Sequence, residues 1–345
     1  MNSREHTDDP ADARRASAVE AREGVLEVPG TLSLHHGGEL PGMRLGWRLS
    51  GAVDGPIVLA LGGISASRRV YGSDAQHNGW WNEIVGPGRA LDATRVRILG
   101  IDYLGGSGES TRPVSGSAFP SLSSYDQADA ILCLLNHLDI KSLRAIVGAS
   151  YGGMIALAFG ERYPERVEQL VVISAADVAH PMATAWRSVQ RSIVRFGIAA
   201  GQSNAGMELA RALAMSTYRS PEEFAARFRS PPRATDGCFT FPVEEYLFAR
   251  GRDYAARHLP ESFVCLSESI DLHRVDATRI TVPTQVVAVR EDQLVPLADM
   301  RALAARLPDA HMHELSSLHG HDAFLKEAEQ LKPILSILSG DNASD

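Results

Sequence analysis

The sequence predicts an α/β fold in which helices cover both faces of a mostly parallel sheet and a helical cap is inserted between two strands. Three observations carry this prediction. Short apolar runs alternate with segments of helical periodicity, one long region shows almost only helical spacing, and a serine lies at a strand-to-helix junction. Apolar strands that alternate with helices are typical of a parallel sheet buried on both faces.

The expected strands are short runs rich in Val, Ile and Leu. Their ranges are 43–49, 57–61, 96–101, 145–147, 169–173, 284–289 and 312–315. Apolar residues recur with helical periodicity at 125–138, 152–163, 297–307 and 323–338. In the interrupting region the helical spacing is clearest at 185–196, 205–215 and 221–228.

These patterns divide the chain into a core and a cap. The α/β core is expected at 25–179 and 275–338, with the cap at 180–274 placed over the active site. The terminal segments 1–24 and 339–345 are polar and short of aromatic residues, so we expect them to be disordered tails.

Composition restricts the partners. The net charge of −8 argues against a nucleic-acid-binding protein, whose affinity depends on basic surface. No apolar run reaches the roughly 18 residues of a membrane span, and the first residues lack the apolar stretch of a signal peptide. Cys133, Cys238 and Cys265 are few and widely spaced, as in a reducing compartment. We expect a cytoplasmic protein with no membrane partner, and no residue cluster has the spacing of metal ligands.

The segment Gly148-Ala149-Ser150-Tyr151-Gly152 fits the motif G-x-S-x-G and joins an expected strand to an expected helix. In the α/β-hydrolase fold this motif is the nucleophile elbow, a strained turn that holds the serine hydroxyl clear of the sheet. The flanking glycines allow the unusual backbone angles and the close approach of strand and helix. Ser150 is therefore the predicted nucleophile, and the α/β-hydrolase fold is the predicted fold.

The acid of the triad is expected after the strand at 284–289. In this fold the catalytic order is serine, then Asp or Glu, then histidine, each after a later strand. That strand runs into Glu291-Asp292, and we choose Asp292 because its position agrees with the order. Glu291 is the neighbouring alternative, and an N-cap of the following helix is the structural alternative for Asp292.

The base is expected in the loop after the last strand, which contains His319-Gly320-His321. His321 lies directly before the last expected helix, behind a glycine that would let the loop approach the serine. His319 could equally be a solvated loop residue, so His321 is the predicted base.

These residues predict acyl transfer through an acyl-serine. His321 would remove the Ser150 proton while Asp292 orients the imidazole. The tetrahedral oxyanion needs two backbone N–H donors, for which we choose Tyr151 and Gly63. A plain tight turn is the alternative for Gly62-Gly63. The glycine-rich loop 104–108 lacks the Gly-Lys-Ser/Thr of a phosphate-binding loop, and we interpret it as the rim of the active site.

Beyond these residues, the chain resembles the homoserine O-acyltransferase family, α/β-hydrolase-fold enzymes that acylate the homoserine hydroxyl from acyl-CoA. Several motifs carry the resemblance and lie in family order. They are Gly79-Trp80-Trp81, Val85-Gly86-Pro87-Gly88-Arg89-Ala90-Leu91-Asp92, Asp102-Tyr103-Leu104-Gly105-Gly106-Ser107, Ser110-Thr111-Arg112-Pro113, Gly148–Met154, Leu209-Ala210-Arg211, Thr217-Tyr218-Arg219, Val243-Glu244-Glu245-Tyr246-Leu247 and Gly320-His321-Asp322-Ala323-Phe324-Leu325.

The resemblance implies a role in methionine biosynthesis, acyl-CoA as co-substrate without a further cofactor, and the triad Ser150, Asp292 and His321. It implies that Arg211 binds the amino-acid acceptor and that Asp322 holds its ammonium. A zwitterion needs a fixed cation and a fixed anion in this way. Family members commonly form homodimers through the cap, so a homodimer is the implied assembly.

The sequence departs from the family pattern around the expected acyl pocket. It has Gly62-Gly63 where many members have Thr-Gly, Tyr151 where methionine is frequent, and Gly-Gly-Ser-Gly-Glu-Ser in the loop at 105–110. Acetyl-CoA and succinyl-CoA therefore both stay open as donors, and a pocket cation would pair with the succinyl carboxylate. The candidate cations are Arg187, Arg191 and Arg219. Serine as acceptor, or water in a serine hydrolase, are the alternatives to homoserine.

Overall fold

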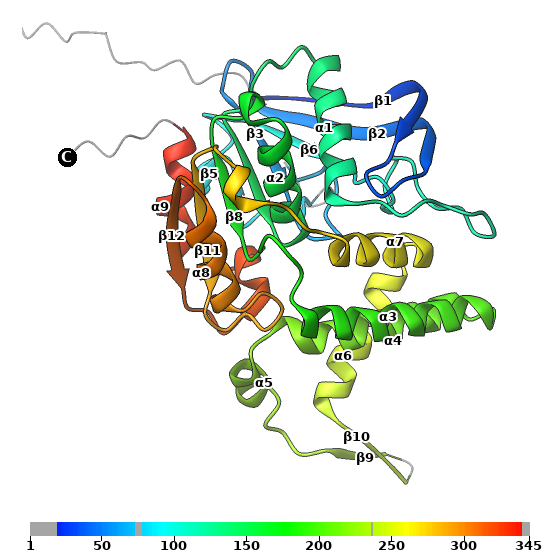
Figure 1. Ribbon diagram of the computed structural model, residues 1–345. Coiled ribbons are helices and arrows are strands. Elements are labelled where there is room, and N and C mark those ends of the chain that lie inside the picture. The colour runs from blue at the N-terminus through cyan, green and yellow to red at the C-terminus, as the bar shows by residue number, and fades with distance from the viewer. Residues whose placement is uncertain (1–18, 73–77, 236, 340–345) are drawn as a thin grey trace, which may run out of the picture.

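The structure is a computed structural model that describes residues 19–72, 78–235 and 237–339. Over these residues a central eight-stranded sheet has the order β1-β2-β6-β3-β7-β8-β11-β12 (Figure 1). The bounds are β1 (Val19–Ser33), β2 (Glu39–Ala52), β6 (Arg97–Ile101), β3 (Ile57–Leu61), β7 (Ala145–Ala149), β8 (Leu170–Ile173), β11 (Thr284–Val289) and β12 (Ala310–Leu315). All neighbours from β6 to β12 are parallel, whereas β2 is antiparallel to β1 and to β6. The prediction of a mostly parallel sheet is confirmed.

Helices bury both faces of this sheet. On one face α1 (Ser124–His137), α2 (Tyr151–Arg162) and α8 (Leu297–Arg306) share a core with Leu59 and Leu61 of β3. On the other face α9 (Ala328–Leu335) packs in a core with Val58 and Ala60 of the same strand. Alternate residues of β3 thus enter different cores, which explains why its sequence is a continuous apolar run.

The cap fills the chain between β8 and β11 (Figure 1). Its helices are α3 (Pro181–Ala199), α4 (Ser203–Tyr218), α5 (Pro221–Arg227), α6 (Pro242–Ala255) and α7 (Pro260–Asp271). The helices predicted in this region are confirmed. The antiparallel ribbon of β9 (Arg233–Thr235) and β10 (Cys238–Thr240) was not expected there.

Two expectations at the ends of the chain are wrong in part. Strand β1 begins at Val19, inside the segment 1–24 expected to be a tail, because its backbone pairs along the whole of β2 from Val19 opposite Ala52. Backbone pairing needs no apolar side chain at an exposed sheet edge, so the polar composition concealed this strand. Ser339, the first residue of the tail expected at 339–345, ends the 3₁₀ helix η4 (Ser336–Ser339). Residues 1–18 and 340–345 lie outside the described residues.

The helix expected at 323–338 is also divided, into η3 (Gly320–Leu325), α9 and η4. Phe324 of η3 and Leu331 of α9 pack in the same core, so the periodicity of apolar residues does not reveal the break. The short elements that complete the chain are β4 (Val85–Gly86), β5 (Leu91–Asp92), η1 (Pro164–Arg166) and η2 (Ala277–Arg279).

Within the described ranges, no helix is both long and apolar enough to cross a membrane.

Candidate active site

Ser150 occupies a strained turn between β7 and α2, with φ 55° and ψ −122°. Close packing makes glycine necessary on either side of it. A Cβ on Gly148 would lie 2.2 Å from the carbonyl oxygen of Gly152, and a Cβ on Gly152 would lie 2.4 Å from the carbonyl oxygen of Leu61. The G-x-S-x-G pattern therefore follows from the sterics of the elbow.

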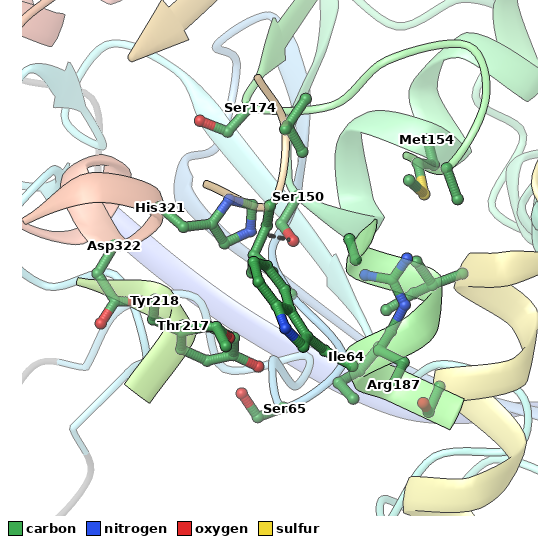
Figure 2. Close-up of a pocket in the computed structure, with 18 of the residues that line it drawn as sticks. Ile64, Ser65, Ser150, Met154, Ser174, Arg187, Thr217, Tyr218, His321 and Asp322 are labelled. Atoms are coloured by element: carbon green, nitrogen blue, oxygen red, sulfur yellow. Dashed lines mark hydrogen bonds between the residues drawn. The ribbon is translucent and has the colours of Figure 1, made fainter. Parts of the chain in front are cut away.

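The structure brings the three predicted triad residues together in one line of hydrogen bonds. Ser150 Oγ lies 2.8 Å from His321 Nε2 (Figure 2). His321 Nδ1 lies 2.7 Å from Asp292 Oδ2. The other oxygen of Asp292 accepts the backbone N–H groups of Leu294 and Val295 at 2.8 and 3.0 Å. Asp292 is fully buried, so its orientation is fixed by these partners.

The two neighbouring alternatives have other partners. Glu291 accepts the backbone N–H of Ser317 at 2.8 Å and the hydroxyl of Ser316. His319 Nδ1 lies 2.7 Å from Arg219 Nη1. Both residues therefore support the loops around the triad without joining it.

The environment of His321 raises its pKa above the ordinary value of 6.5. Burial lowers this pKa, but the charge of Asp292 and the hydrogen bond to it outweigh burial. The carboxylate thus favours the imidazolium that forms when the imidazole takes a proton from Ser150.

The loop after β3 orients a peptide group toward the cavity. The carbonyl oxygen of Gly62 accepts hydrogen bonds from Gly152 N at 2.9 Å and from the Tyr103 hydroxyl at 2.7 Å. In a trans peptide the C=O and the following N–H point in opposite directions. The N–H of Gly63, which lines the cavity, is therefore directed away from those donors. Among the residues that the structure describes, neither this N–H nor that of Tyr151 has an acceptor.

The side chain of Tyr151 and the glycine-rich loop lie outside the cavity lining. The Tyr151 hydroxyl makes a 2.7 Å hydrogen bond with Ser269 Oγ of α7. The carbonyl oxygen of Gly106 accepts a hydrogen bond from Ser262 Oγ of α7 at 3.0 Å. Our interpretation of 104–108 as the rim of the active site is therefore wrong, because this loop packs beneath a cap helix.

Arg211 and Asp322 both line the cavity that contains Ser150 and His321. Arg211 lies over the rings of Tyr218 and Tyr254, at 4.9 and 4.4 Å, and donates to the Tyr218 hydroxyl at 3.0 Å. No carboxylate of a described residue forms an ion pair with it. Asp322 Oδ2 accepts a hydrogen bond from Arg219 Nε at 3.0 Å. The cavity thus holds a cation without an anionic partner beside a carboxylate.

Comparisons with known proteins agree with this geometry. A family model described as the alpha/beta hydrolase fold matches residues 56–328. The homoserine O-succinyltransferase of Xanthomonas campestris pv. campestris is 42% identical over 94% of this chain and 85% of that protein. The chain belongs to the homoserine O-acyltransferase family.

Other members of the family differ in the substrates that their names give. The serine O-succinyltransferase of Litchfieldella anticariensis is 33% identical over 90% of this chain and 96% of its own length. The crystal structure of homoserine O-acetyltransferase from Bacillus anthracis superposes with a TM-score of 0.82 at 17% identity, over 95% of this chain and 99% of that one. At this low identity the superposition shows the shared fold.

Sequence reasoning missed the part of the homoserine O-acyltransferase site that depends on packing within the cap. Tyr254, whose ring lies over Arg211, comes from α6, and its own sequence surroundings carry no signal of this contact. Of the three candidate cations for the acyl group, Arg187 lines the cavity. Arg191 pairs with Asp271, and Arg219 pairs with Asp322. In the described part of the chain, no cluster of His, Cys, Asp or Glu could hold a metal ion.

Proposed function

We propose that this chain transfers an acyl group from acyl-CoA to the hydroxyl of L-homoserine through an acyl-serine intermediate, a step in methionine biosynthesis. The observation that carries this proposal is the line of hydrogen bonds from Ser150 through His321 to Asp292. Ser150 and His321 line a cavity that also contains Arg211, an arginine that forms no ion pair with a carboxylate of the described residues. The names of the relatives support homoserine as acceptor.

In the first half of the reaction Ser150 Oγ attacks the thioester carbonyl while its proton moves to His321 Nε2. The oxyanion would lie against the N–H groups of Gly63 and Tyr151. The bond from carbonyl carbon to sulfur then breaks, and the thiol of CoA leaves with the proton from His321. The acyl group remains as an ester on Ser150.

The second half reverses these roles. His321 removes the proton of the homoserine hydroxyl, the hydroxyl oxygen attacks the ester carbonyl, and Ser150 regains its proton as the acyl product leaves. Arg211 binds the carboxylate of homoserine, and Asp322 holds its ammonium. The cap at 180–274 covers this cavity, and its helices would form the interface of a homodimer. We place the enzyme in the cytoplasm, with acyl-CoA and the amino acid as its partners and no resident cofactor.

Replacing Arg211 by alanine should raise the KM for homoserine by about 10- to 100-fold, since the substrate carboxylate loses a charged hydrogen-bond donor. The KM for acyl-CoA should change by less than about threefold, a smaller effect than losing a single hydrogen bond. Steady-state kinetics with each substrate varied in turn measure both values. Arg252→Ala is the matched control, because Arg252 pairs with Glu208 on the cap surface and does not line the cavity. An unchanged KM for homoserine would remove Arg211 from the acceptor site.

Activity should fall at acidic pH with a midpoint above 6.5, because only neutral His321 can accept the serine proton and its pKa is raised. The profile of kcat/KM for acyl-CoA against pH measures this midpoint. Because His321 acts as the base, its protonation as the pH decreases removes activity. A midpoint below the ordinary histidine value would contradict the stabilisation of the imidazolium by Asp292.

A product assay tests the proposal as a whole. Purified enzyme is incubated with acyl-CoA and homoserine, serine or no amino acid, and the products are identified by mass spectrometry. O-acylhomoserine is the expected product. Equal thioester consumption with and without an amino acid, giving only free acid, would instead identify a serine hydrolase. Preferred formation of O-acylserine would identify serine as the acceptor.

A further inference from the structure

Two aromatic rings contact Arg211, the residue to which we assign the carboxylate of the amino acid. The central carbon of its guanidinium lies 4.9 Å from the centre of the Tyr218 ring and 4.4 Å from the centre of the Tyr254 ring. Arg211 and Tyr218 belong to α4, whereas Tyr254 belongs to α6, which packs against α4 (Figure 1). The ring of Tyr254 therefore reaches the arginine only because these two cap helices pack together.

Tyr254 is itself fixed within the cap. It is 5% exposed and packs in a small apolar core with Val194 of α3 and Phe263 of α7. The imidazole of His258 stacks on its ring, with 3.9 Å between the ring centres and 9° between the ring planes. Burial lowers the pKa of His258 below its ordinary value of 6.5, so this imidazole is uncharged at neutral pH and does not repel the arginine.

The two rings stabilise the charge of Arg211 without neutralising it. In the described part of the chain this arginine forms no ion pair and donates a hydrogen bond only to the Tyr218 hydroxyl. A guanidinium group has several N–H donors, so most of them stay free for a ligand. Attraction to the face of an aromatic ring uses none of these donors. A carboxylate in the place of Tyr254 would instead occupy the donors and cancel the charge that attracts a substrate anion.

We propose that Tyr254 is a positioning residue for the amino-acid acceptor, because its ring holds the guanidinium of Arg211 in the orientation that binds the substrate carboxylate. This inference rests on the proposed function, since it explains how the acceptor half of that site keeps a charged and available arginine. Tyr254 does not line the cavity of Ser150, so it acts through Arg211 and does not contact the substrate. The transfer from acyl-CoA to Ser150 makes no use of Arg211, so Tyr254 should affect acceptor binding alone.

Steady-state kinetics of two variants of the full chain test the inference. Tyr254→Leu should raise the KM for homoserine by about 5- to 30-fold, as expected for the loss of one partly buried cation–π contact. Tyr254→Phe keeps the ring and should leave this KM within about twofold of the wild-type value. The KM for acyl-CoA should stay within about twofold in both variants. A partly unfolded preparation lowers the apparent kcat but not KM, so the KM for homoserine reports the role of the ring.

Tyr246→Leu is the matched control. Tyr246 belongs to the same helix, and its ring contacts Arg227, whose guanidinium carbon lies 4.2 Å from the ring centre. Neither Tyr246 nor Arg227 lines the cavity of Ser150. The same substitution at the same kind of contact should therefore leave the KM for homoserine within about twofold.

The possible failures are distinguishable. An unchanged KM for homoserine in Tyr254→Leu, together with a raised KM in Arg211→Ala, would overturn the role of Tyr254 and leave the proposed function intact. Equal increases in Tyr254→Leu and Tyr254→Phe, or in Tyr254→Leu and Tyr246→Leu, would also overturn it, because the ring beside Arg211 would then not be the cause. An unchanged KM in Arg211→Ala would contradict both the acceptor assignment and the inference.

Calorimetry covers the case in which the wild type forms no acylated amino acid. That result would contradict the proposed function, and the dissociation constant of homoserine would then replace KM as the measured value. An increase in this constant for Tyr254→Leu, without an increase for Tyr254→Phe, would still support the positioning of Arg211 by the ring. An unchanged constant, or no binding of homoserine to the wild type, would overturn it.

Discussion

Replacing Ser150 by alanine is expected to lower kcat for acyl transfer by about 10⁴- to 10⁶-fold while the protein stays folded. In the proposed mechanism Ser150 supplies the oxygen that carries the acyl group, and His321 has no other alcohol within hydrogen-bonding distance in the described structure. The small hydroxyl contributes little packing free energy. Thiol release measures kcat, intact-protein mass spectrometry detects the acyl-enzyme in the wild type, and thermal unfolding reports the fold.

Ser124 provides a matched control, because it forms the other buried serine–histidine pair of the described chain. Its Oγ lies 2.7 Å from His273 Nδ1, and neither residue lines the cavity. Burial lowers the pKa of His273 to about 3, so that imidazole is neutral. Ser124→Ala should cost about 1–3 kcal/mol of stability from the lost hydrogen bond and change kcat by less than about threefold. Turnover that survives Ser150→Ala but is lost with Ser124→Ala would show that the nucleophile assignment is wrong.

The contrast between strands β3 and β1 explains how much of the fold the sequence could predict. β3 was predicted with its observed bounds, Ile57–Leu61, because helices bury both of its faces and every position must be apolar. The whole of β1 (Val19–Ser33) was missed, because an edge strand is held largely by backbone hydrogen bonds, which leave little mark on side-chain composition. Periodicity therefore predicts the interior of such a sheet better than its edge.

The same distinction applies to the site. Ser150, Asp292 and His321 could be chosen because each follows a strand, and strand ends are marked locally in the sequence. Arg187, Arg191 and Arg219 could not be ranked, because they are the same residue type and differ only in their surroundings. Arg187 and Arg191 share Asp271, Arg219 pairs with Asp322, and of the three only Arg187 lines the cavity of Ser150. Asp271 comes from α7 and Asp322 from η3, both far along the chain from these arginines, and only packing within the cap and of the cap against the core brings them together. Chemistry that depends on order along the chain is visible in the sequence, whereas charge balance within the cavity is not.

Asp292→Asn should reduce kcat by about 10³- to 10⁴-fold, with little change in structure. The asparagine carbonyl oxygen can still accept the N–H groups of Leu294 and Val295. Its amide nitrogen would then face His321 Nδ1 as a donor, which places the imidazole proton on Nε2. In that tautomer His321 cannot accept the proton of Ser150. Thiol-release kinetics measure the loss, and thermal unfolding tests whether the fold is retained.

Glu291→Gln separates this effect from a general loss of negative charge after β11. Glu291 accepts hydrogen bonds from Ser316 and Ser317, and no atom of His321 bonds to it in the described structure. Its replacement should weaken the loop and lower the melting temperature, because a hydrogen bond to a charged group is worth about 1.5–3 kcal/mol of stability. We expect kcat to fall by less than about threefold, because Glu291 does not bond to His321. If the two variants lost activity equally, the orientation of the imidazole by Asp292 would not explain catalysis. A large loss for Asp292→Asn alone would show that the tautomer of His321, and not the local charge, is what the carboxylate contributes.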